Sequence, residues 1–277
     1  METLKIGLQM NNAAAITETL IETAPPPAKH ACQINDIKPL STSTFHVELQ
    51  SVDNAILDYQ AGQYLQLDLD VNNDGKLHSL FYSIANRFDP KHYHAKQHCR
   101  LQLFIQIDSE RSRAILKRLY ELHKSHSRLD ITLPLGQAYL QTDLRLTHLL
   151  IAAGSGISKI KCLTEEILHR QCDANVAIYW SNKSIDDFYL LDDFQNWPHQ
   201  NNKLNFTPIL ESAHDNWQGR SGYIYQLIEK DFIDLSKVKA YLCGSPQMVY
   251  GTIDKLKLRG LKEKNCYSDV FEYAPRK

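Results

Sequence analysis

Apolar and polar side chains alternate along much of the chain between residues 31 and 140. Alternation with a period of two predicts strands that bury one face. The strand segments are residues 44–49, 64–69, 80–85, 101–107 and 129–133. An amphipathic helix interrupts them, with Ile115, Leu116, Leu119 and Leu122 on its apolar side. Short strands at this spacing predict a closed antiparallel β-barrel over residues 30–143.

From His148 onward the pattern changes to strands that alternate with helices. Apolar runs predict strands at residues 148–153, 176–180, 204–207 and 238–243, and helical periodicity falls between them, including residues 186–194 and 247–258. This alternation is typical of a doubly wound parallel sheet. The sequence therefore predicts two domains, an antiparallel β-barrel followed by an α/β domain over residues 144–277.

Residues 1–29 differ from both domains and are interpreted as an N-terminal extension. A short helical pattern with Ile16, Leu20 and Ile21 precedes Pro25-Pro26-Pro27, which bars continuation of a helix. We interpret this segment as a tail or packing arm.

The amino-acid composition argues against several classes of protein. The net charge of −1 gives no electrostatic argument for nucleic acid or an anionic membrane surface, and no apolar run is long enough to cross a bilayer. The six cysteines include no Cys-x-x-Cys pair, which argues against a zinc or iron–sulfur site, so we expect no metal. With no secretory signal pattern at the N-terminus, we expect a cytoplasmic protein with reduced cysteines.

The strand at residues 148–153 ends at Gly154-Ser155-Gly156, and a helical pattern begins directly afterwards. Strand, glycine turn and helix together direct backbone N–H groups at a phosphate, although glycines also close ordinary strand-to-helix turns. Ser181-Asn182-Lys183 and Cys243-Gly244-Ser245-Pro246 follow two other strands of the same domain. Since ligands bind at the carboxyl ends of parallel strands, these three segments predict one site.

Seven motifs in order resemble the ferredoxin–NADP reductase superfamily, and more closely its bacterial NAD(P)H:flavin oxidoreductases, over residues 31–277. They are Gly62-Gln63-Tyr64, Tyr82-Ser83-Ile84-Ala85-Asn86, Gly136-Gln137-Ala138-Tyr139-Leu140, residues 151–158, Ile178-Tyr179-Trp180, Trp217-Gln218-Gly219-Arg220-Ser221-Gly222 and Cys243-Gly244-Ser245-Pro246-Gln247-Met248. The resemblance implies a flavin-binding barrel followed by an NAD(P)-binding domain.

The resemblance also implies roles for two residues at the reaction centre. The Ser83 hydroxyl serves flavin N5, and Cys243 lies beside nicotinamide C4. As alternatives, Ser83 is a strand-edge hydroxyl and Cys243 a buried structural thiol, since free cysteine is commonly buried.

The same resemblance implies a wider set of cofactor-binding residues. Tyr82 packs on the flavin, or else is a barrel-core aromatic. Phe271, in a predicted terminal strand at residues 269–273, covers the flavin face, or else belongs to the core. The full set is Gly62, Gln63, Tyr64, Tyr82, Ser83, Ile84, Ala85, Phe104, Gly136, Gly154, Ser155, Gly156, Ser181, Lys183, Gly244, Pro246, Met248 and Phe271.

Departures from the family pattern bear on flavin retention. Leu80 stands where the family has an arginine that neutralises the flavin phosphate, a loss of about 1.5–3 kcal/mol of charge-assisted hydrogen bonding. His78, Arg111 or Arg113 could substitute for it. The glycine-containing turn that holds an FAD pyrophosphate is also missing after Ile107, and both departures predict weak flavin retention.

Two lysines also bear on the nucleotide site. Lys159 takes the place of the family's proline after the glycine loop, a proline that flavin reductases also lack. Lys183 either reads the 2′-phosphate of NADP or is a solvated loop lysine, so NADH and NADPH both stay open.

We therefore expect an NAD(P)H-dependent flavin reductase that passes hydride from nicotinamide C4 to flavin N5. The cofactors are NADH or NADPH and FAD or FMN, the flavin being loosely bound or a substrate. One alternative is an FAD-containing electron-transfer reductase that serves a separate ferredoxin or oxygenase partner. Another is a degenerate, non-catalytic nucleotide-binding module. The expected partners are these small molecules and, in the first alternative, a protein electron acceptor, with no nucleic acid and no membrane span.

Overall fold

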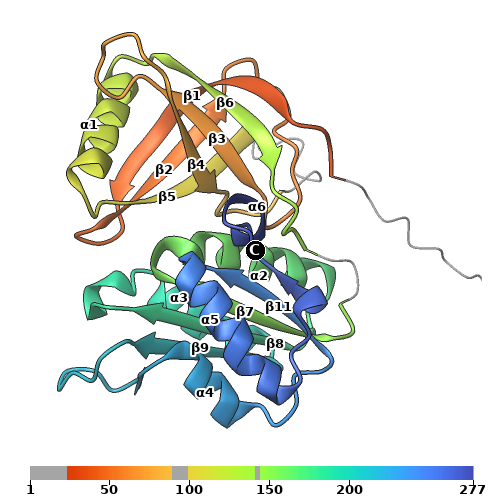
Figure 1. The fold of residues 1–277 in the computed structure, drawn as a ribbon. Helices are drawn as coiled ribbons and strands as arrows, with labels where there is room; N and C mark the ends of the chain where they lie inside the picture. The colour runs from red at the N-terminus through yellow and green to blue at the C-terminus, as the bar shows by residue number, and fades with distance from the viewer. Residues whose placement is uncertain (1–23, 89–98, 141–143, 277) are drawn as a thin grey trace, which may run out of the picture.

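The computed structural model describes residues 24–88, 99–140 and 144–276, which form two domains, one above the other in Figure 1. Most of the predicted N-terminal extension lies outside the described residues. Its last two residues, Ala28 and Lys29, belong to the first strand, β1 (Ala28–Pro39). The antiparallel pairing of β1 with two later strands therefore starts slightly before the predicted boundary.

Six antiparallel strands build the first domain (Figure 1). After β1 they are β2 (Thr44–Ser51), β3 (Tyr64–Leu69), β4 (His78–Ser83), β5 (Arg100–Gln106) and β6 (Arg128–Leu135), in the spatial order β4-β3-β6-β1-β2-β5. The two edge strands approach each other, and the Ala85 amide donates to the Gln102 carbonyl at 2.8 Å. The described residues form no ladder between β4 and β5, so the predicted closed barrel is a half-barrel with a seam.

Helix α1 (Glu110–Lys124) closes one end of this sheet. Its buried residues are the four predicted from the sequence, Ile115, Leu116, Leu119 and Leu122. The side chains of Ser109 and Ser112 form a reciprocal capping box that fixes where the helix begins.

The second domain is a parallel sheet with helices on both faces, as predicted (Figure 1). Its strands are β7 (Thr147–Ala153), β8 (Val176–Asn182), β9 (Leu204–Leu210), β10 (Arg220–Ser221), β11 (Val238–Cys243) and β12 (Cys266–Tyr267), in the order β10-β9-β8-β7-β11-β12. Its helices are α2 (Ile157–Arg170), α3 (Leu191–Gln200), α4 (Ile224–Asp231), α5 (Pro246–Leu256) and α6 (Val270–Tyr273). Short 3₁₀ turns occupy Gly154–Gly156, Ile185–Asp187, Lys257–Arg259 and Glu263–Asn265.

Two local predictions in this domain were wrong. The helix predicted at residues 186–194 is a 3₁₀ turn followed by α3, which begins only at Leu191. The strand predicted at residues 269–273 is the short helix α6. Ser268 causes the second difference, because its carbonyl accepts from the Phe271 amide at 3.2 Å and its hydroxyl from the Val270 amide at 3.3 Å. These two bonds turn the chain away from the sheet.

The two domains share one hydrophobic core. Leu65 and Ile84 of the half-barrel belong to the same buried cluster as Ile160 on α2 and Trp180 on β8. A second cluster fills the opposite side of the parallel sheet, under α4 and α5. Helix α2 is thus packed on both domains, which fixes their relative position.

Polar contacts reinforce this junction. The Ser43 hydroxyl, in the turn before β2, donates to the Asp187 carboxylate at 2.7 Å. The Cys162 thiol of α2 donates to the Asn86 carbonyl at 3.0 Å. None of the helices within the described ranges is both long and apolar enough to cross a membrane.

Candidate active site

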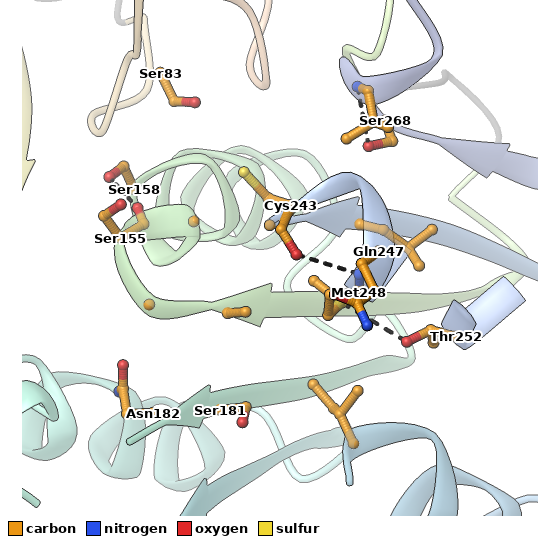
Figure 2. Close-up of a pocket in the computed structure, with 18 of the residues that line it drawn as sticks. Ser83, Ser155, Ser158, Ser181, Asn182, Cys243, Gln247, Met248, Thr252 and Ser268 are labelled. Atoms are coloured by element: carbon orange, nitrogen blue, oxygen red, sulfur yellow. Dashed lines mark hydrogen bonds between the residues drawn. The ribbon is translucent and has the colours of Figure 1, made fainter. Parts of the chain in front are cut away.

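A cleft of about 1470 Å³ lies between the half-barrel and the carboxyl edge of the parallel sheet. Figure 2 shows Ser83 of the half-barrel on one side and Ser181 and Asn182 of β8 on the other. The glycine loop and Cys243, at the end of β11, lie between them. This volume exceeds that of an ordinary single-ligand pocket, so two ligands can meet in it.

Most of the predicted site residues line this one cleft, although they come from separate parts of the chain. Those that line it are Tyr64, Tyr82, Ser83, Phe104, Gly154, Ser155, Gly156, Ser181, Lys183, Cys243, Gly244 and Met248. The half-barrel contributes the first four, the ends of three parallel strands contribute the next seven, and α5 contributes Met248. The cleft therefore brings both predicted halves of the site together.

Other predicted residues lie behind the cleft surface. Ile84 and Ala85 are fully buried in the core, and Pro246 begins α5. The Gln63 side-chain amide donates to the Gly136 carbonyl at 3.0 Å, which ties two cleft-side loops together. These residues support the cleft surface and are not part of it.

Two glycines of this supporting set are required by close packing. Gly62 and Gly136 both have positive φ angles, of +101° and +91°. A Cβ at Gly62 would lie 2.9 Å from the Ala138 carbonyl oxygen, and one at Gly136 would lie 2.7 Å from the Tyr64 ring. Larger side chains are therefore excluded where the loops pass each other.

Phe271 was predicted to cover the flavin face, but the structure places it away from the cleft. Its ring packs against Tyr250 with 5.8 Å between ring centroids, beside the core of the nucleotide domain. It does not line the cleft, which agrees with the core alternative. The turn at Ser268 instead brings Tyr273 to the cleft, where it is 65% exposed.

The glycine loop packs directly on the end of β11. A Cβ at Gly156 would overlap the Cys243 carbonyl and lie 2.9 Å from its carbon. Gly154 has φ of +55°, and its carbonyl accepts from the Trp180 indole N–H at 2.9 Å. This packing holds the loop amides and Cys243 together at one point of the cleft.

Cys243 is a neutral thiol at physiological pH. Burial raises its pKa to about 11, and the nearby Asp269 carboxylate adds to the rise. The Lys159 charge and the Ser83 hydroxyl across the cleft lower this pKa and so oppose the rise. Cys243 therefore presents a protonated thiol to the cleft, at the end of β11 in the α/β domain.

Sequence reasoning missed an ion pair in the cleft. The Lys159 ammonium lies 2.9 Å from both carboxylate oxygens of Asp269. The Lys159 side chain is only 1% exposed, whereas that of Asp269 is 17% exposed and lines the cleft. The one available signal was that Lys159 replaces the family's proline.

Further cleft residues were not among the predicted site residues, although Ser158, Asn182 and Gln247 lie within motifs named from the sequence. They are Phe81, Gln106, Asp108, Ser158, Asn182, Asp187, Glu211, Tyr223, Tyr225, Gln247, Thr252, Lys255, Ser268 and Tyr273. Several could have been found from topology, since Glu211 directly follows β9 as Lys183 follows β8.

The position of the missing family arginine is not on the cleft surface. Leu80 is buried in the half-barrel core and pairs with Leu67 of β3. Tyr82, two residues later, does line the cleft, and burial raises its pKa to about 12, an effect that the Arg111 charge opposes. Arg111 is thus a cation that acts on a cleft residue from the first turn of α1.

Comparison with known proteins agrees with this fold. The family model for the oxidoreductase NAD-binding domain matches residues 150–253. A CDP-6-deoxy-L-threo-D-glycero-4-hexulose-3-dehydrase reductase of Yersinia pestis is 26% identical over 242 residues, covering 87% of this chain and 68% of the relative. A probable flavin reductase of Vibrio harveyi is 24% identical over 245 residues, covering 87% of this chain and 99% of the relative.

Solved structures show the same two-domain fold. The Amycolatopsis cytochrome P450 reductase GcoB aligns with a TM-score of 0.76 at 22% identity, over 88% of this chain and 70% of that one. The half-barrel, the parallel sheet and the cleft between them therefore have the fold of these two-domain reductases, and residues 150–253 match the oxidoreductase NAD-binding domain family.

Proposed function

We propose that this protein is an NAD(P)H-dependent flavin reductase. The proposal rests on one observation: Ser83 and Cys243, which come from different domains, line the same cleft. A flavin would be held by the half-barrel side of the cleft and the nicotinamide by the side of the parallel sheet. The match to a probable flavin reductase over nearly its whole length supports this assignment.

In this reaction the residues of the chain bind and orient the reactants and do not themselves form or break bonds. A flavin bound here would supply N5 as the acceptor for hydride from nicotinamide C4. The backbone of residues 154–156 would hold the dinucleotide pyrophosphate, and Gly244 would let the backbone approach the nicotinamide. The neutral Cys243 thiol shapes the nicotinamide pocket, and the Ser83 hydroxyl is available to hydrogen-bond N5. Holding the reacting atoms about 3–3.5 Å apart accounts for most of the expected rate gain.

The half-barrel side of the cleft fits a flavin ring system. Tyr64, Phe81 and Tyr82 line it with aromatic surface, and the Tyr64 and Phe81 rings meet edge to face at 6.0 Å. Position 80 offers no cation there, and of the three possible substitutes, His78, Arg111 and Arg113, we favour Arg111 for the flavin phosphate because its charge acts on the cleft residue Tyr82. Weak phosphate binding suits a flavin that is released as a product.

A cytoplasmic location accords with this reaction. All six cysteines are free, and four of them are buried in the core as thiols. Reduced cysteines are usual in reducing compartments.

An electron-transfer reductase is the second candidate function. Phe81 is 59% exposed beside the cleft, which gives a partner protein an apolar contact close to the flavin. Relatives described as reductases of a sugar dehydrase and of a cytochrome P450 support this candidate. The chain spans about two thirds of the length of those relatives.

A visible spectrum and a turnover assay separate the candidates. A flavin reductase purifies with little colour and oxidises NADH or NADPH only when FMN, FAD or riboflavin is added. A yellow protein that passes electrons to an artificial acceptor, such as ferricyanide, without added flavin would favour the electron-transfer reductase. A protein that binds a dinucleotide and reduces no flavin would be the degenerate module, and the proposal would then fail.

A further inference from the structure

The ion pair between Lys159 and Asp269 joins two distant segments at the cleft. Lys159 lies in the first turn of α2, directly after the glycine loop, and Asp269 immediately precedes α6. The ammonium donates to both carboxylate oxygens at 2.9 Å, and it is almost completely shielded from water. An ammonium so buried needs a counter-charge, so Asp269 is held in one orientation.

The segment that contains Asp269 is fixed from two further sides. The Glu272 carboxylate accepts from the Gln137 amide, next to the half-barrel, at 2.7 Å. The Tyr250 hydroxyl of α5 donates to the Ala274 carbonyl at 2.8 Å. Lys159 supplies a further attachment, from behind the cleft wall, to the Asp269 carboxylate that lines the cleft.

Both charges of the pair act on the proposed reaction centre. The Asp269 carboxylate raises the pKa of the Cys243 thiol, and the Lys159 ammonium lowers it. A nicotinamide beside Cys243 is exposed to the same two charges. The ring is neutral in NAD(P)H and positive after it has lost hydride, so an unbalanced carboxylate would hold the product more tightly than the substrate.

We propose that Lys159 is a positioning residue for hydride transfer, which holds the Asp269 carboxylate in place beside Cys243 and balances its charge so that the oxidised nicotinamide is released. This inference rests on the proposed function, because it requires the nicotinamide to lie next to Cys243. Lys159 itself acts through Asp269.

Dinucleotide binding without flavin gives the test a readout that does not depend on turnover. Dissociation constants are measured by calorimetry for NAD⁺ and NADH, or for NADP⁺ and NADPH if the wild type prefers them. In Lys159→Met the affinity for the oxidised dinucleotide, relative to that for the reduced one, should rise by about tenfold, because the Asp269 carboxylate is left without its counter-charge. In Asp269→Asn the preference should shift the opposite way, and in the double variant it should return towards the wild type.

Lys203→Met is the matched control. Lys203 forms an ion pair of similar length with Asp173, at 3.0 Å, but on the exposed surface. This variant should leave the ratio of the two dissociation constants unchanged.

A purely structural ion pair would give a different result. Both single variants would lose thermal stability, while the preference for oxidised or reduced dinucleotide stayed constant or moved in one direction only. That outcome would overturn the inference and leave the proposed function intact. A wild type that binds neither dinucleotide would instead refute the proposed function.

The double variant keeps the test decisive if a single variant fails to fold. A neutral pair removes the unbalanced buried charge, so Lys159→Met/Asp269→Asn should fold. If Asp269 is needed in its fixed position, reduction of added FMN should be at least about tenfold slower in stopped-flow measurements. Reduction at the wild-type rate would overturn the inference.

Discussion

Gly156 and Cys243 are in direct contact, so that a Cβ on Gly156 would overlap the Cys243 carbonyl. The contact joins the glycine loop after β7 to the end of the neighbouring strand β11. Both partners are backbone, which cannot move aside as a flexible side chain can. The position of the loop amides and the position of the thiol are therefore coupled.

Gly156→Ala should consequently damage both dinucleotide binding and turnover. We expect KM for NAD(P)H to rise and the rate of flavin reduction to fall by about tenfold or more, since small displacements of reacting groups are costly. Steady-state kinetics measures both.

Gly75→Ala is the control for this prediction. Gly75 has φ of +82° in a turn of the half-barrel, with nothing near its Cβ position. Its replacement should lower stability by about 1–2 kcal/mol through backbone strain and leave the kinetics unchanged. An unaltered KM in Gly156→Ala would contradict the assignment of the loop to the pyrophosphate.

Cys243→Ala should lower turnover with little change in dinucleotide affinity, because the thiol shapes the pocket and carries no charge. With a pKa of about 11, the thiol stays almost fully protonated up to pH 9. The pH profile between 6 and 9 should therefore show no ionisation that disappears in Cys243→Ala. Such an ionisation would mean that the thiolate takes part in the reaction.

Lys183→Ala should weaken the use of NADPH and spare that of NADH, provided Lys183 reads the 2′-phosphate. The lysine is exposed at the cleft directly after β8, a position compatible with either role. Comparison of kcat/KM for the two nucleotides decides between them. Equal losses, or none, would identify a solvated lysine.

Arg111→Ala should weaken FMN and FAD and leave riboflavin unaffected. Losing a charge-assisted hydrogen bond of about 1.5–3 kcal/mol corresponds to about tenfold or more in affinity. Isothermal titration of the three flavins measures it, with Arg113→Ala as the control from the same helical turn. Equal weakening for riboflavin would mean that Arg111 acts on the ring pocket and not on the phosphate.

The position of Leu80 changes what Leu80→Arg should do. The sequence alone suggests that an arginine there restores phosphate binding, as in the family. Because Leu80 is buried against Leu67, an arginine at this position places a charge in the half-barrel core. We now expect Leu80→Arg to lower the thermal stability by at least several degrees, with no selective gain for FMN.

Local patterns explain what the sequence could predict. The apolar run of β7 and the glycines after it lie next to each other in the chain, so the strand, the turn and the start of α2 could be predicted together. The buried face of α1 followed in the same way from its helical spacing.

Features that depend on tertiary contacts could not be predicted. Lys159 and Asp269 are 110 residues apart, and neither belongs to a motif that indicates an ion pair. Tyr273, and not Phe271, lines the cleft because the chain turns at Ser268. One hydrogen bond to the Ser268 hydroxyl and one to its carbonyl produce this turn. Neither the pairing nor the turn has a periodic signal.

The hydrophobic core shared by both domains also determines how the molecule unfolds. Helix α2 buries side chains such as Ile160 and Leu163 in the same cluster as half-barrel residues, so unfolding of either domain exposes part of the core of the other. Neither part is then an independent cooperative unit, and calorimetry should record one transition in place of two. The half-barrel expressed alone would leave its share of this core exposed, and we expect it to aggregate.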